Sequence, residues 1–164
     1  MKISMSHWMT ALALMAVGSS PTVAEVVPTK LVAQPCLTSA TLAKPPHMKE
    51  VRRLLAGLPH ATRRRQAEIF QSLEALGDEG VPALVAQMDD HRKLTNQAIA
   101  LENKFPGAFE GTRFYGPELV VDAIDAILNQ ITGHGGSIVN GGTKQTRRAA
   151  VASWRKYVTE MRCR

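Results

Sequence analysis

The sequence predicts an all-α fold built from antiparallel helical hairpins. Apolar residues recur at helical spacing in five separate segments of the 164-residue chain. Glycine or proline stands near the ends of most of these segments, as is typical of helix boundaries. Strand-like alternation is confined to residues 96–115, where a small β-hairpin and an irregular loop both fit the pattern.

The first two expected helices cover residues 47–58 and 62–76. Each has one apolar face at spacings of three and four residues. Gly77 is a suitable C-cap for the second helix, because glycine readily adopts the left-handed conformation found there. The apolar faces consist of Val51, Leu54, Leu55 and Leu58 in the first helix and of Ile69, Phe70, Leu73 and Leu76 in the second.

A third helix is expected from Gly80 or Val81, with Asp78 as its cap and Pro82 in its first turn. The stretch LEALGDEGVPALVAQMDD (73–90) resembles a HEAT-type repeat, in which a helix, a Gly-Asp turn and a Val-Pro-x-Leu helix start follow one another. In such repeats antiparallel helix pairs stack on their neighbours. The resemblance implies a short HEAT/armadillo-like array.

Two further amphipathic helices flank a glycine-rich loop. One is expected to open at Pro117 and to end at Gly133, and its carboxylates Asp122 and Asp125 are expected on the solvated face. The other is expected over residues 144–161. Its apolar stripe consists of Val151, Trp154, Val158 and Met161.

The loop between these helices, GHGGSIVNGG (133–142), holds five of the twelve glycines. Links between antiparallel helices usually take about 2–8 residues, so its length favours a contact loop over a simple connection, which is the alternative. The sequence therefore predicts a partner-binding site in and after this loop. Its residues are Gly133, His134, Gly135, Gly136, Ser137, Asn140, Gly141, Arg147 and Arg148.

The N-terminal segment is typical of a secretory signal peptide. Residues 1–24 combine Lys2, an apolar run and small residues before Glu25, which predicts export, with a single domain over residues 25–164 that starts with an extended leader (25–47). In an exported protein the two cysteines, Cys36 and Cys163, predict one disulfide; two free thiols or a bond between chains are the alternatives.

Several function classes fit the sequence poorly. The glycine loop has neither a dinucleotide fingerprint nor a phosphate loop, and no nucleophile, metal-ligand or cofactor pattern is present. The net charge of +6 suits nucleic acid, but export and the few aromatic residues argue against it. No apolar run beyond the signal peptide predicts membrane insertion. A hydrolase that pairs His134 with Asp122 or Asp125 is the remaining enzymatic alternative.

The chain is similar to the small exported helical immunity proteins that neutralise type VI secretion amidase effectors. The similarity lies in size, signal peptide, helical content and the cysteine pair. It implies a periplasmic protein whose loop, residues 133–143, occludes the active site of a peptidoglycan amidase, with Arg147 and Arg148 steering toward an acidic surface. A periplasmic HEAT-like scaffold or adaptor is the alternative.

Overall fold

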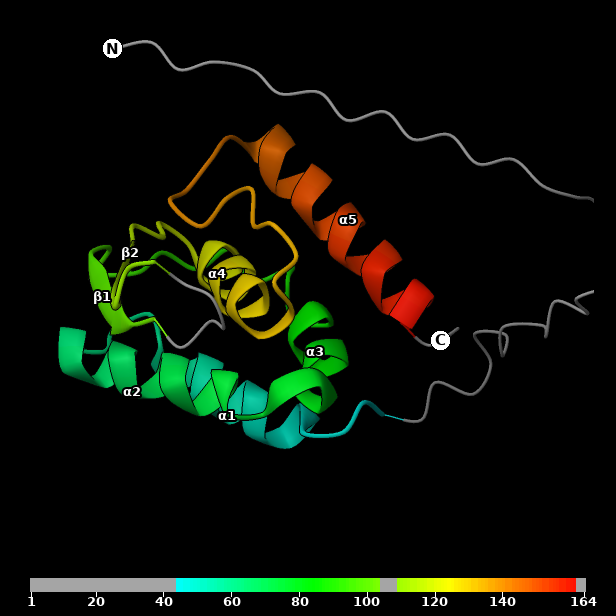
Figure 1. The fold of residues 1–164 in the computed structure, drawn as a ribbon, viewed down its shortest axis with the longest axis horizontal. Coiled ribbons are helices and arrows are strands. Elements are labelled where there is room, and N and C mark those ends of the chain that lie inside the picture. The colour runs from blue at the N-terminus through cyan, green and yellow to red at the C-terminus, as the bar shows by residue number, and fades with distance from the viewer. Residues whose placement is uncertain (1–43, 104–108, 162–164) are drawn as a thin grey trace, which may run out of the picture. The chain divides into compact units, whose positions relative to one another are not determined.

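The computed structural model describes residues 44–103 and 109–161. The predicted signal peptide (1–24), most of the predicted leader (25–47) and the predicted Cys36–Cys163 disulfide lie outside these residues. The described part is mainly helical, with one small antiparallel sheet (Figure 1). Its elements are α1 (Met48–Gly57), α2 (Arg63–Glu74), α3 (Gly77–Val85), β1 (Ile99–Glu102), β2 (Thr112–Tyr115), α4 (Val120–Thr132) and α5 (Lys144–Met161).

Helices α1, α2 and α5 lie where the apolar spacing predicts them, whereas α3 and α4 begin elsewhere. Helix α3 starts at Gly77, whose φ of 56° lets the chain turn directly out of α2. Helix α4 starts at Val120 instead of Pro117. The reason is that Leu119 forms an antiparallel bridge with Lys93, so its backbone is extended where a helix would otherwise begin.

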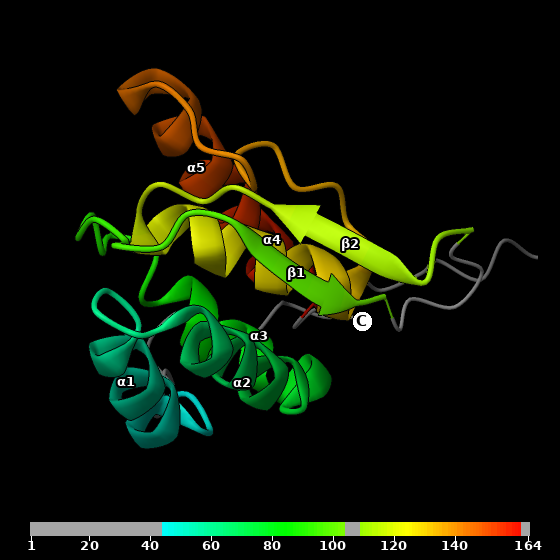
Figure 2. The same ribbon diagram turned by 90° about the vertical axis from the view of Figure 1, so that its left-hand side faces the viewer.

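The two expected strands are present and pair as an antiparallel hairpin. Ile99 lies opposite Tyr115 and Leu101 opposite Arg113. Ile99 and Leu101 are buried, whereas Phe114 on the opposite face is exposed. Figure 2 shows the two strands side by side and alongside α4, to which they are joined by a hydrogen bond of 2.7 Å from Arg113 to Gln130.

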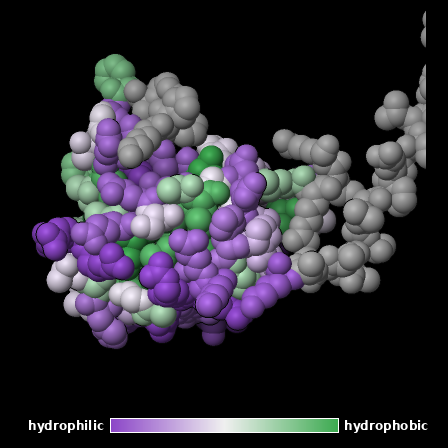
Figure 3. Space-filling model, turned by 90° about the horizontal axis from the view of Figure 1, so that it is seen from below, coloured by the Kyte–Doolittle hydropathy of each residue, from purple (hydrophilic) through white to green (hydrophobic). Residues whose placement is uncertain are grey.

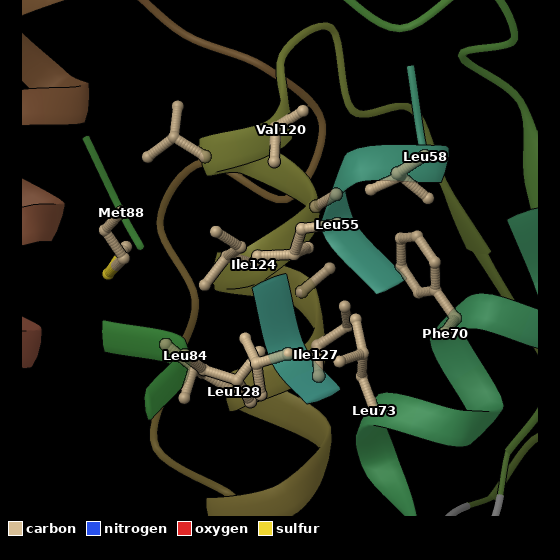
Figure 4. Close-up of a cluster of buried hydrophobic side chains, with 14 of the residues drawn as sticks. Leu55, Leu58, Phe70, Leu73, Leu84, Met88, Val120, Ile124, Ile127 and Leu128 are labelled. Atoms are coloured by element: carbon tan, nitrogen blue, oxygen red, sulfur yellow. The ribbon is translucent and has the colours of Figure 1, made fainter. Parts of the chain in front are cut away.

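Helix α4 is the centre of the core. Every residue from Val120 to Leu128 is buried, and α2, α3 and α5 all contact this helix. Each buried aliphatic or aromatic side chain contributes about 1.5–3 kcal/mol through the hydrophobic effect. The close-up in Figure 4 shows Val120, Ile124, Ile127 and Leu128 of α4 among Leu55, Leu58, Phe70, Leu73, Leu84 and Met88.

Candidate functional site

The glycine-rich segment after α4 is fastened along that helix. We call residues 133–143 the strap. Asn129 donates a hydrogen bond of 2.8 Å to the carbonyl of His134, and the backbone N–H of Ile138 donates one of 2.9 Å to Asp125. Asn140 accepts one of 2.7 Å from the backbone N–H of Gly116. The strap therefore runs back from the C-terminal end of α4 to its N-terminal end.

The contacts of α5 explain why the strap is long. Arg147 near the start of α5 meets Asp122 near the start of α4, and Trp154 further along meets Asp125. Tyr157 then lies against His134, just beyond the end of α4. Contacts thus advance in the same chain direction along both helices, and the expected antiparallel hairpin of α4 and α5 is wrong. The connection must return over a helix about 20 Å long.

The expectation that Asp122 and Asp125 face solvent is also wrong. Both are 0% exposed, because the strap and α5 cover the side of α4 on which they lie. Asp125 accepts hydrogen bonds from the indole N–H of Trp154 at 2.6 Å and from the backbone of Ile138. Burial raises the pKa of its carboxyl group, and the hydrogen bonds oppose this rise only in part.

Asp122 is the centre of an ion-pair cluster. Its two oxygens accept hydrogen bonds of 2.7 and 2.8 Å from the guanidinium of Arg147, which also donates one of 2.7 Å to Glu118. Asp122 also accepts a hydrogen bond from the backbone N–H of Leu119, which would otherwise have no partner within the helix at the start of α4. The hydrogen bonds with Asp122 raise the pKa of Arg147, so its positive charge is fixed.

These contacts change the expected role of Arg147. The residue is only 9% exposed, and its charge is neutralised inside the protein. The sequence predicts that Arg147 steers an acidic partner toward the loop, but this buried and paired side chain is not placed to do so. Its neighbour Arg148 is exposed and remains available for that role.

Close packing and backbone conformation favour glycine at Gly136 and Gly141 of the loop. A Cβ atom on Gly136 would lie 2.9 Å from a carboxylate oxygen of Asp125 and 2.7 Å from Val139. Gly141 has a φ of 85°, and a Cβ atom there would lie 2.8 Å from the side chain of Glu118. The close approach of the strap to α4, together with the positive φ of Gly141, therefore accounts for glycine at these two positions.

His134 packs on two aromatic rings of α5. Its ring centroid lies 5.3 Å from that of Trp154 and 5.1 Å from that of Tyr157. Among the described residues no hydrogen bond joins its imidazole to Asp122 or Asp125, whose oxygens are bonded to Arg147 and Trp154. The geometry therefore gives no support to the acid–base pair of the enzymatic alternative.

The remaining predicted site residues form the outer side of the strap and the start of α5. The exposed ones are Gly133, His134, Gly135, Ser137, Asn140 and Arg148, whereas Gly136 and Gly141 are half-buried. The sequence reasoning missed Ile138, which is 1% exposed and anchors the strap in the core. An aliphatic residue inside an otherwise polar and glycine-rich loop was the available signal.

Within the described ranges, no cluster of three or more His, Cys, Asp or Glu side chains is placed to hold a metal ion. None of the helices in this part of the chain is long and apolar enough to cross a membrane.

Comparisons with protein-family models, with curated proteins and with solved structures returned no match. The interpretation of the site therefore depends on its geometry.

Proposed function

We propose that this protein is an exported, periplasmic binding protein that inhibits a peptidoglycan amidase by covering its active site with the strap. The proposal combines the resemblance to type VI amidase immunity proteins in size, signal peptide, helical content and cysteine pair with one structural observation. The strap has an ordered backbone anchored at both ends of α4, and its outer side exposes polar groups. This arrangement supports binding, because a preordered loop loses little conformational entropy when it meets a partner.

The binding surface in this proposal is a fixed ridge and not a flexible plug. Gly135 leaves main-chain groups accessible, and His134 and Ser137 add side-chain hydrogen-bonding groups. Arg148 supplies the exposed positive charge that attracts an acidic partner surface. Arg147 acts indirectly, by holding the start of α5 against α4.

We also propose that α2 and α3 form a HEAT-like pair. The support is local: the two helices contact each other and are joined through Gly77, as the sequence motif predicts. A scaffold or adaptor function is the second candidate. It is favoured by the exposed aromatic side chains of the hairpin, which lie outside the strap.

Gly135 offers a direct test of the amidase proposal. A Cβ atom there meets nothing within 4 Å, so Gly135→Arg leaves the fold intact and adds a bulky side chain to the proposed contact. The assay takes any amidase that is encoded beside this chain's gene and measures how fast it cleaves peptidoglycan. We expect wild-type protein to inhibit it and Gly135→Arg to weaken inhibition by about tenfold or more, which corresponds to about 1.4 kcal/mol.

Gly111→Arg is the matched control, because Gly111 lies in the hairpin region and also has open space around it. It should inhibit as the wild type does. Equal inhibition by the Gly135→Arg and wild-type proteins would remove the strap from the proposal. Absence of an amidase gene beside this one, or absence of inhibition by the wild type, would count against the amidase itself and favour the scaffold function.

A further inference from the structure

A second surface is formed by α2 and the hairpin, which lie on the opposite side of α4 from α5 (Figure 1). A groove of about 450 Å³ separates the first half of α2 from the hairpin. This volume is in the range of sites that hold a few side chains or a small ligand. The groove is lined by Arg63, Arg64, Ala67, Ala98, Ile99, Ala100, Phe114 and Tyr115.

One large apolar side chain of the groove, that of Phe114, is exposed to solvent. Phe114 is 72% exposed and lies directly across from Ala100 in the strand register, on the face of the hairpin that points away from the core. Its ring has no aromatic partner among the described residues, whereas Tyr115 beside it stacks on Phe70. A large exposed ring beside a groove is a frequent feature of protein contact sites.

The wall of the groove formed by α2 is basic. Arg63, Arg64 and Arg65 occupy the first turn of this helix, where positive charge opposes the helix dipole and so does not stabilise the helix. Glu68 pairs closely with Arg65 at 2.9 Å and more loosely with Arg64 at 3.6 Å. The side chain of Arg64 remains 92% exposed.

The acidic residues of the hairpin lie away from this wall. Glu102 lies opposite Thr112 in the strand register, on the same outward face as Phe114 but at the end of the hairpin nearer the C-terminal end of α2, where Arg113 bonds Glu74. Glu110 precedes that end of the hairpin. Among the described residues, the charge at the start of α2 is therefore positive, because three arginines lie there and the carboxylate of Glu68 pairs with two of them. Figure 3 shows the face formed by α1 and α2, which is predominantly hydrophilic with small apolar patches.

We propose that this groove binds an acidic segment of another protein. An apolar side chain of that segment packs on Phe114 and Ala100, and neighbouring carboxylates pair with Arg63 and Arg64. Arginine suits this task because its guanidinium group binds a carboxylate through two parallel hydrogen bonds. This site is separate from the strap, so it does not depend on the amidase proposal.

The test uses fluorescence anisotropy with a labelled ten-residue peptide in which glutamate and leucine alternate. We expect the purified chain to bind it and added salt to weaken the binding. Phe114→Ser should weaken binding by about tenfold or more, as expected when a central contact residue is removed. The double charge reversal Arg63→Glu with Arg64→Glu should do the same.

Two controls distinguish binding at this groove from nonspecific binding of the peptide. Phe109 is fully exposed but does not line the groove, so Phe109→Ser should change affinity by about twofold at most. Arg52→Glu with Arg53→Glu makes the same charge change on an exposed part of α1 and should have a small effect. If the Arg63 and Arg64 reversal lowers helicity, the neutral pair Arg63→Gln with Arg64→Gln replaces it.

Three outcomes overturn the proposal. One is no binding of the glutamate–leucine peptide by the wild type. Another is equal binding of a polyglutamate peptide or of a version with lysine in place of glutamate, because the first lacks apolar side chains and the second lacks carboxylates. The last is an equal loss in the Phe109→Ser and Phe114→Ser proteins.

Discussion

The two sides of α4 are both buried, but they are buried by different chemistry. Toward α1, α2 and α3 the helix presents aliphatic side chains such as Ile124 and Leu128 to other aliphatic and aromatic groups. Toward α5 and the strap it presents Asp122 and Asp125, both fully buried. One side is held by the non-directional hydrophobic effect and the other by hydrogen bonds of fixed geometry.

The difference lies in how each side tolerates change. Apolar packing tolerates swaps between side chains of similar volume, at a cost that is usually below about 1.5 kcal/mol. A buried carboxylate must keep its partners, because an unpaired buried charge costs several kcal/mol. The polar side therefore specifies where α5 and the strap must lie.

The largest effect is expected from removing the partner of Asp122. Arg147→Met keeps the aliphatic stem but leaves Asp122 as a buried charge without its guanidinium, so we expect a loss of about 3–5 kcal/mol in the free energy of unfolding. Urea denaturation followed by circular dichroism measures this loss. Arg148→Met is the control, and a change at this exposed position should remain within about 0.5 kcal/mol.

An effect of Arg147→Met as small as that of Arg148→Met would contradict the comparison. It would mean that Asp122 finds water or another donor once Arg147 is gone. The polar side of α4 would then be as tolerant as the apolar side, and the position of α5 would not depend on this ion pair.

A smaller effect is expected where the strap approaches Asp125. In Gly136→Ala the new methyl group would meet a carboxylate oxygen of Asp125 at 2.9 Å and Val139 at 2.7 Å, so the strap must shift. We expect a loss of about 1–3 kcal/mol, as for other overpacked sites. Gly135→Ala adds the same methyl group in open space and should be nearly neutral. Equal stability of the two variants would show that the strap moves away from α4 at little cost.

Much of the fold could be predicted from local pattern. The apolar spacing places α1, α2 and α5 close to their observed bounds, and Gly133 ends α4 with a φ of 67°, as expected for a C-cap glycine. The alternation of apolar and polar residues within 96–115 also indicates the hairpin that β1 and β2 form. These features depend on residues within one element or one turn, which is the information that periodicity contains.

The polar side of α4 could not be predicted in this way. An amphipathic pattern shows that one face is apolar, but it does not show whether the polar face meets water or another element. Asp122 and Asp125 are buried only because Arg147 and Trp154, about 25 residues and more away in the chain, supply matching donors. The length of the strap could not be explained from local pattern either, because it depends on the relative direction of α4 and α5.

The smallest predicted effect concerns the protonation of Asp125. Burial raises the pKa of this carboxyl group in the folded protein above its usual value, so the folded state holds the proton to a higher pH than the unfolded state does. Its contribution to stability is full below the unfolded pKa of about 3.9 and is lost as the pH rises through the folded pKa. Asp125→Asn should therefore become more stable relative to the wild type as the pH rises through this window.

Asp90 provides a control of opposite sign. Burial would raise the pKa of Asp90, but hydrogen bonds from Arg92 outweigh it and lower the pKa. The contribution of Asp90 to stability is present above the unfolded pKa and is lost as the pH falls through the folded pKa. Asp90→Asn should therefore become more stable relative to the wild type as the pH falls. Urea denaturation from pH 3 to pH 7 measures both differences. If the stability differences of Asp125→Asn and Asp90→Asn from the wild type change with pH in opposite directions, an ionisable carboxyl group is buried on the polar side of α4. If the difference for Asp125→Asn does not change with pH, water reaches Asp125 beneath the strap. The two sides of α4 would then differ less than their burial indicates.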